Sequence, residues 1–209
     1  MKIAIFGATG GTGRLVVEQA LEAGHEVIAF VRDPSKLNLK HEHLTVVQGD
    51  VTDLAPVERA VNGADAVISV LNTRGESKSK PITRGAQNIL RAMAQHGVRR
   101  LVFSAAPSAA DPHDAPDLRF RLMTALVRLV ARAAQEDLIS SVEAVRASDT
   151  DWTIVRLPFP TDDPKTGRVQ VGYVNREIGM RISRADAAEF MLKEVQEAKY
   201  VRQAPLIAN

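Results

Sequence analysis

Residues 7–13 read Gly-Ala-Thr-Gly-Gly-Thr-Gly, and they stand between an apolar run, Lys2–Phe6, and a helical pattern, Leu15–Ala23. A strand, a glycine-rich turn and a helix in this order are typical of a site for a dinucleotide pyrophosphate. One glycine makes the turn, a second lets backbone amides approach the phosphate, and a third lets the helix pack on the strand. The positive dipole end of the helix attracts the anion. A tight turn without a ligand is the alternative.

The rest of the chain alternates apolar runs with helical patterns. The predicted strands are Lys2–Phe6, Glu26–Val31, Leu44–Gln48, Ala66–Leu71, Arg100–Ser104 and Thr153–Leu157. The predicted helices are Leu15–Ala23, Leu54–Val61, Pro81–Gln95 and one that opens with the capping-box sequence Ser183–Asp186 and runs to Val195. This alternation predicts the α/β class, with a doubly wound parallel sheet of the Rossmann type. We expect residues 1–209 to form one domain.

Two irregular regions each follow a strand, Ser108–Asp117 and Thr161–Gly179. Ligands of such sheets bind beyond the carboxyl ends of the strands, so both regions are candidate walls of a pocket. The stretch Leu118–Ala134 carries an apolar stripe at helical spacing. We interpret it as a helix that covers the sheet; a membrane-surface or partner helix is the alternative.

Composition excludes several classes of protein. The chain has 209 residues, 45% hydrophobic and 25% charged, with a net charge of +2 and no cysteine. No window reaches the roughly 18 apolar residues of a membrane span, no signal peptide is visible, and no basic run indicates nucleic acid. The lack of cysteine favours a reducing cytoplasm. His41 and His43 are close in sequence but have no third ligand nearby, so we expect no metal site.

The end of the second predicted strand bears on the choice of nucleotide. A carboxylate there binds the ribose 2′-hydroxyl of NAD, but this chain has Arg32, with Lys36 shortly after. Guanidinium and ammonium groups suit a 2′-phosphate, which favours NADP(H) over NAD(H). Asp33 is adjacent and keeps NAD open, and both basic residues could also be solvated surface charges.

Several stretches together resemble the atypical short-chain dehydrogenase/reductase group, in particular the NAD(P)H-flavin reductase and biliverdin reductase B-like proteins, with NmrA-like proteins near them. They are residues 7–13, Val31–Asp33, Gly49–Val51, Leu71–Arg74, Asp151–Arg156 and Ile182–Asp186. The resemblance covers nearly the whole chain. It implies a Rossmann fold with a small C-terminal part that covers the cofactor and substrate. It also implies NADPH-dependent reduction of flavins and related conjugated rings.

The resemblance implies a set of cofactor contacts. With Gly7 in the turn, the phosphates would be met by Thr9, Gly10, Gly11, Thr12 and Gly13, the 2′-phosphate by Arg32 and Lys36, the adenine by Asp50 and Val51, the rest of the adenosine half by Val70, Leu71 and Asn72, and the nicotinamide by Ser104, Ala105 and Pro158.

The sequence lacks the proton-transfer pair of the larger superfamily, a tyrosine with a lysine four positions later. The two tyrosines are Tyr173 and Tyr200, and the positions that follow them at this spacing hold Glu177 and Ala204. Ile139 stands where the NmrA-like branch often has a lysine. Alcohol oxidation and nucleotide-sugar epimerisation are therefore disfavoured. Hydride transfer to a flavin needs mainly the placement of two flat rings, with FMN or FAD as substrate.

The substrate end offers few polar groups. Ser104 is the candidate catalytic residue; a strand-end hydroxyl bonded to backbone is the equally plain interpretation. Pro107, Phe159 and Pro160 would form an apolar floor for a flat aromatic substrate, unless they only pack. Thr73 and Arg74 are further candidates for substrate contact, and Arg74 would attract an anionic substrate unless it is solvated.

Two functions remain open. One is an NAD(P)H-dependent reductase of flavin or a quinone-like acceptor. The other is a non-catalytic, NADP(H)-binding redox-sensing module of NmrA-like type. Either would work as a monomer or homodimer.

Overall fold

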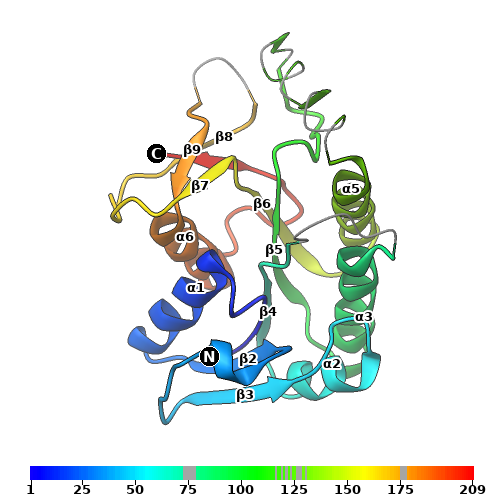
Figure 1. Ribbon diagram of the computed structural model, residues 1–209, viewed down its shortest axis with the longest axis vertical. Coiled ribbons are helices and arrows are strands. Elements are labelled where there is room, and N and C mark those ends of the chain that lie inside the picture. The colour runs from blue at the N-terminus through cyan, green and yellow to red at the C-terminus, as the bar shows by residue number, and fades with distance from the viewer. Residues whose placement is uncertain are drawn as a thin grey trace.

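The computed structural model describes residues 1–72, 79–115, 117–118, 120, 122, 124–125, 129, 131–174 and 178–209. Its described strands form an eight-stranded sheet in the order β3-β2-β1-β4-β5-β6-β10-β8 (Figure 1). The last pairing, of β8 with β10, is antiparallel, and the others in this sheet are parallel. The strands are β1 (Lys2–Phe6), β2 (Glu26–Val31), β3 (Leu44–Gln48), β4 (Ala66–Ser69), β5 (Arg100–Ala105), β6 (Asp151–Arg156), β8 (Gln170–Gly172) and β10 (Leu206–Ala208).

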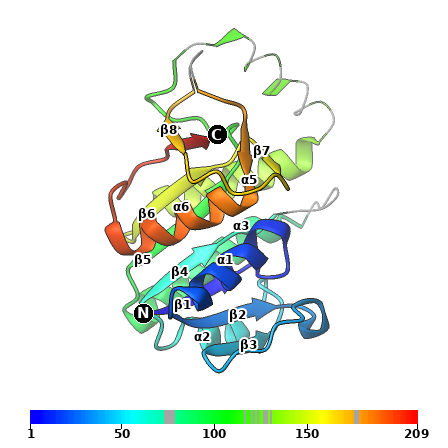
Figure 2. The same ribbon diagram turned by 90° about the vertical axis from the view of Figure 1, so that its left-hand side faces the viewer.

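Helices cover both faces of the sheet (Figures 1 and 2). One face carries α1 (Gly11–Glu22) and α6 (Arg184–Glu197), and the other carries α2 (Leu54–Val61), α3 (Pro81–His96) and α5 (Arg132–Arg146). Each layer of helices closes its own apolar core against the sheet. Every residue of the central strand β4 is buried, as expected for a parallel strand covered on both sides. The predicted α/β class with a Rossmann-type sheet is confirmed.

Most predicted elements are present, with shifts at their ends. β1, β2, β3 and α2 have the predicted bounds. α1 begins at Gly11 instead of Leu15, because the end of the glycine loop itself forms the first helical turn. β4 ends at Ser69 instead of Leu71, and β6 is shifted toward the N-terminus of its predicted range, to Asp151–Arg156.

The predicted helix Leu118–Ala134 requires a correction. The backbone at Ala131 has φ −131° and ψ 44°, which is not helical, and the helix that packs on the sheet, α5, begins only after it. Leu118, Leu122 and Leu129 are 64–82% exposed, so these leucines do not cover the sheet. The remaining leucine of the stripe, Leu126, lies outside the described residues. Local periodicity identified a helical stretch but not its partner.

The C-terminal part adds strands that the sequence pattern did not reveal. β7 (Phe159–Thr161) pairs in parallel with β9 (Arg181–Ser183) as a separate small sheet, and β9 leads directly into α6 (Figure 1). The Ser183 hydroxyl accepts a hydrogen bond from the Asp186 amide, as the capping-box pattern predicts. These short strands are hard to recognise because each spans only three residues.

A buried ion pair joins the two irregular regions to the sheet. Arg156, at the end of β6, is fully buried and donates two hydrogen bonds to Asp114, at 2.7 and 2.8 Å. Asp114 also accepts from the backbone amides of Asp111 and Val174. The loop after β5 and the segment after β8 are therefore held by one carboxylate, and Arg156 itself is further fixed by the Ala204 carbonyl.

Asp114→Ala should lower the free energy of unfolding by about 3–5 kcal/mol, because it leaves the Arg156 guanidinium buried without a counter-charge. Urea unfolding at neutral pH measures this. Arg132→Ala, which removes an exposed i,i+4 pair with Glu136, is the control and should cost less than about 1 kcal/mol. Equal effects of the two substitutions would contradict the role of the buried pair.

The same carboxylate predicts a pH dependence. Burial acts to raise the pKa of Asp114, but hydrogen bonds from Arg156 and two backbone amides outweigh it, so the pKa is held below its ordinary value. This stabilisation is present above the unfolded-state pKa of about 3.9 and is lost as the pH falls through the folded-state value. As the pH is lowered from 7, the free energy of unfolding should decline less for Asp114→Asn than for the wild type. Parallel declines would contradict the role of the Asp114 carboxylate.

Candidate cofactor site

The glycine loop lies where β1, β4 and α1 meet. Gly7 has φ +86°, and a Cβ built on it would lie 2.6 Å from the backbone oxygen of Val70, which follows β4. A Cβ on Gly13 would lie 2.1 Å from the Gly7 oxygen. Real Cβ atoms do not approach backbone so closely, so both positions require glycine. The loop is thus pressed against the neighbouring strand end, as a phosphate-binding turn must be.

The N-terminus of α1 is open to an anion. Gly10, the N-cap residue just before the helix, has an extended conformation, and no side chain caps the helix. The first internal hydrogen bond of the helix runs from the Arg14 amide to the Gly10 carbonyl, at 2.9 Å. The amides of Gly11, Thr12 and Gly13 thus have no acceptor among the described residues. Three unpaired amides at the positive end of a 12-residue helix fit a pyrophosphate group.

Two threonine hydroxyls accompany these amides. Thr9 is exposed, and Thr12 is buried, with 8% of its surface exposed. Within the described part of the chain, neither hydroxyl has a hydrogen-bond partner. By contrast, the first amides of α3 are already satisfied, because the Asp137 carboxylate accepts from Ile82 and Thr83. The start of α1 therefore retains free donors that the start of α3 does not.

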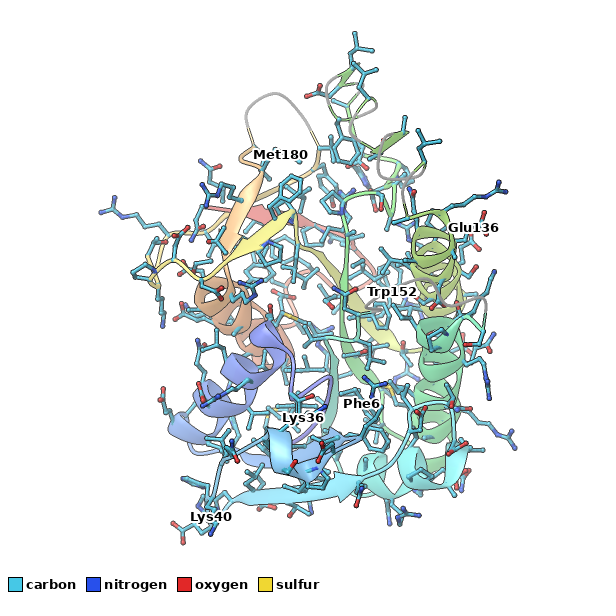
Figure 3. The ribbon with its side chains drawn as sticks, viewed as in Figure 1. Phe6, Lys36, Lys40, Glu136, Trp152 and Met180 are labelled. Carbon is cyan, nitrogen blue, oxygen red and sulfur yellow. The ribbon has the colours of Figure 1, made fainter. Side chains whose placement is uncertain are left out.

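The basic residues predicted for a 2′-phosphate lie at the end of β2. Arg32 is exposed, and Lys36 lies on the short 3₁₀ helix η1 (Pro34–Lys36; Figure 3). Asp33 caps that helix, since its carboxylate accepts from both the amide and the hydroxyl of Ser35. These two hydrogen bonds lower the pKa of Asp33, with Lys36 contributing. Asp33 thus accepts from Ser35 at Oδ1 and pairs with Lys36 through Oδ2 at 3.8 Å, whereas Arg32 makes no ion pair within the described ranges.

A second arginine at this end was missed by sequence reasoning. The pKa of Asp50 is lowered first by hydrogen bonds from the amide and hydroxyl of Thr52, and further by the charges of Arg32 and Arg84. Arg84, on the first turn of α3, donates to the Thr52 carbonyl at 3.5 Å, two residues beyond Asp50. Nothing in the local sequence around Arg84 indicates this, because α3 reaches the adenosine end only through the fold.

The predicted adenine contacts follow β3 and β4. Val51 packs against Gly85 of α3, where an added Cβ would lie 2.8 Å from its methyl groups, and its carbonyl accepts from Asn88. Leu71 is partly buried and Asn72 exposed at the end of β4. Thr73 and Arg74, predicted to contact substrate, lie outside the described residues.

The predicted nicotinamide end combines one hydroxyl with apolar groups. Ser104 lies near the end of β5, is 8% exposed, and its hydroxyl has no partner in the part of the chain that is described. Among the described residues, no backbone partner of this hydroxyl is found, and the choice between the two interpretations stays open. Ala105 and Pro107 follow Ser104 closely in the chain, and Pro158 follows the neighbouring strand β6. All three residues are buried.

Phe159 and Pro160 begin β7, beyond the end of β6. The Phe159 side chain is 53% exposed, although its amide is fixed by the Met180 carbonyl. Pro160 is partly buried. An aromatic ring held by its backbone and left open to solvent can stack on a flat molecule, so the packing-only interpretation does not describe Phe159.

Comparison with known proteins identifies the family. A family model described as NAD(P)H-binding matches residues 7–198, nearly the whole chain. The chain therefore belongs to the NAD(P)H-binding family, the group that its motifs resemble.

Individual relatives agree with this assignment. A (4-alkanoyl-5-oxo-2,5-dihydrofuran-3-yl)methyl phosphate reductase from Streptomyces griseus is 32% identical over 154 residues, which are 74% of this chain and 46% of that protein. The chain spans less than half the length of the curated relatives it matches.

Two solved structures share the fold. ChuY, an anaerobillin reductase from Escherichia coli O157:H7, superposes with a TM-score of 0.83 at 19% identity, over 99% of this chain and 96% of its own. The oxidoreductase ylbE from Lactococcus lactis superposes with a TM-score of 0.81 at 19% identity, over 100% and 91%. At this identity the likeness establishes the Rossmann fold alone.

Gly13→Ala tests the cradle. The added Cβ would press on the Gly7 carbonyl and displace α1, so the free energy of unfolding should fall by about 1–3 kcal/mol and NADPH affinity by about ten-fold or more. Calorimetric titration and urea unfolding measure both. Gly63→Ala, at φ +74° in open space, should cost about 1 kcal/mol and leave affinity unchanged. Unchanged binding in Gly13→Ala would argue against a phosphate at the loop.

Proposed function

We propose that the chain is an NADPH-dependent reductase that delivers hydride to a flat conjugated acceptor of the flavin or quinone type. The observation that carries the proposal is the uncapped start of α1 beneath a loop that tolerates only glycine at Gly7 and Gly13. This is the donor arrangement that a dinucleotide needs, and the chain belongs to a family that binds NAD(P)H. A reductase among its relatives supports the reaction class.

The preference for NADPH rests on the end of β2. Arg32 and Lys36 offer cations to a 2′-phosphate, while the Asp33 carboxylate is already an acceptor for Ser35. The Ser35 bonds and the Lys36 pair reduce the capacity of Asp33 to accept from a ribose diol. Arg84 adds positive charge near Asp50, on the side from which the adenosine would be held. The balance of charge therefore favours the phosphorylated dinucleotide.

The chemistry asks little of the side chains at the far end. When bound, NADPH supplies the hydride. Ala105, Pro107 and Pro158 exclude water from the ring, and Phe159 offers a face on which an acceptor stacks. The unpartnered Ser104 hydroxyl can pass a proton from water to the reduced acceptor, which needs one proton for each hydride received.

The second candidate is a redox-sensing module that binds NADP(H) without turnover. It is favoured by the sparse donor set, since Ser104 is the one predicted proton donor and the Tyr–Lys pair is absent from the sequence. A sensor must distinguish the two oxidation states, so its affinities for NADP and NADPH must differ. Equal affinities would exclude this candidate.

Turnover decides between the two. When the protein is mixed with NADPH and with FMN, FAD or a quinone, the absorbance of NADPH should fall faster than in the same mixture without protein. No acceleration over a panel of such acceptors, with binding of NADPH intact, would overturn the reductase and leave the sensor.

Arg32→Ala should weaken NADPH by about 1–3 kcal/mol and NADH much less, because only NADPH has the phosphate that the guanidinium would bind. Titration with both nucleotides measures the difference. Arg59→Ala removes an exposed arginine from the far end of α2 and is the charge-matched control. Equal weakening of the two nucleotides would show that the 2′-phosphate is not at Arg32.

A further inference from the structure

An arginine from the C-terminal part lies directly on the glycine loop. A Cβ added to Gly11 would stand 2.9 Å from both Cδ and Nε of Arg184, the first residue of α6. Gly11 is the first residue of α1, where the unpaired amides begin. A guanidinium therefore lies beside the donors proposed for the pyrophosphate. The sequence shows Arg184 only as part of a capping box, since Gly11 is far away in the chain.

The position of Arg184 is fixed by its backbone. Gln19 of α1 donates to the carbonyl of Ala185 at 3.0 Å, which ties the start of α6 to α1. The Ser183 hydroxyl caps α6 by accepting from the Asp186 amide. These bonds fix the backbone on either side of Arg184 beside α1, and the ion pair with Asp162 orients its guanidinium.

The charge partner of Arg184 is weakly held. Its Nη1 lies 2.6 Å from Asp162 Oδ1, but the Asp162 side chain is 90% exposed while that of Arg184 is 27% exposed. An ion pair with so exposed an acid adds little, because water and salt replace the acid readily. A phosphate bound to the α1 amides would carry more charge than the Asp162 carboxylate and could accept a bidentate pair of hydrogen bonds from the guanidinium.

The acid sits on a segment that is itself anchored. The buried Asp186 carboxylate accepts from the amides of Thr166 and Gly167, so the stretch after β7 is bound to the start of α6. Burial acts to raise the pKa of Asp186, but these amides and the Ser183 hydroxyl hold it below its ordinary value. Asp162 lies shortly before this anchored stretch and forms the ion pair with Arg184, so it would compete with a phosphate for the guanidinium.

We propose that Arg184 is a pyrophosphate-binding residue, and that it exchanges the Asp162 carboxylate for a phosphate of the dinucleotide when the cofactor binds. The inference rests on the proposed function, because it takes the glycine loop as the cofactor site. It adds a cation from the C-terminal part to a subsite otherwise built from backbone amides. Because Asp162 competes for the same guanidinium, it would lower the affinity for the dinucleotide.

Calorimetric titration with two ligand fragments tests the proposal. ADP-ribose has the pyrophosphate but no 2′-phosphate, and adenosine 2′-monophosphate has the reverse. Arg184→Ala should weaken NADPH and ADP-ribose by roughly ten- to a hundred-fold, the loss of a charged hydrogen bond, and leave adenosine 2′-monophosphate unchanged. Arg32→Ala should give the opposite pattern, weakening the 2′-phosphate ligands and sparing ADP-ribose.

The chain supplies a matched control. Arg181, on β9, is paired with Asp163 at 3.5 Å, so it is an exposed arginine from the same segments with an exposed acid of the same kind. Arg181→Ala should leave both fragments unchanged. Asp162→Asn removes the competing acid and should tighten ADP-ribose about two- to five-fold, as expected when a like charge near an anion is removed.

The outcomes separate the two proposals. If Arg184→Ala binds ADP-ribose as tightly as the wild type or more tightly, the inference is overturned and the pair with Asp162 is structural. If Arg184→Ala weakens both fragments equally, the site as a whole has been disturbed and the specific role is again refuted. If the wild type binds neither NADPH nor ADP-ribose, the cofactor site itself fails.

Discussion

The closeness of β1, β4 and α1 is the constraint on which the site depends. The strand end at Val70 lies so near Gly7, and Gly7 so near Gly13, that no side chain fits at either glycine. That contact aims the start of α1 outward with its amides unpaired. A side chain at either position would move the helix, and with it the phosphate donors. The proposed dinucleotide site thus depends on backbone packing, with side chains added around it.

The two ends of the site differ in what holds them. The proposed adenosine end is polar: Arg32 follows β2, and Arg84 of α3 donates to the Thr52 carbonyl at 3.5 Å. The proposed nicotinamide end is apolar apart from Ser104, with Phe159 open to solvent. Such a division suits a protein that grips its cofactor by phosphates and leaves the reactive end for a flat partner. Asp186 ties the stretch after β7 to the start of α6, and the Arg156–Asp114 pair ties the loop after β5 and the segment at Val174 to the end of β6.

Sequence patterns predicted what is local. Strand and helix periodicity, the glycine spacing and the Ser183 cap each depend on neighbours within a few residues, and they lie close to the predicted places. The boundary of α1 was wrong because a glycine-rich turn does not look helical. The start of α5 was not predicted, because the non-helical residue that precedes it, Ala131, is neither glycine nor proline. The contact of Arg184 with Gly11 and the bond of Arg156 to Asp114 join distant segments, so local pattern reasoning could not find them.

The central claim is that the glycine loop holds a dinucleotide. A crystal structure of the protein grown with NADPH measures this directly. The account predicts one nucleotide along the carboxyl edge of the sheet, with its pyrophosphate on the amides of Gly11 and Thr12 and its 2′-phosphate at Arg32. Electron density without nucleotide at saturating NADPH, or a nucleotide bound elsewhere, would contradict it.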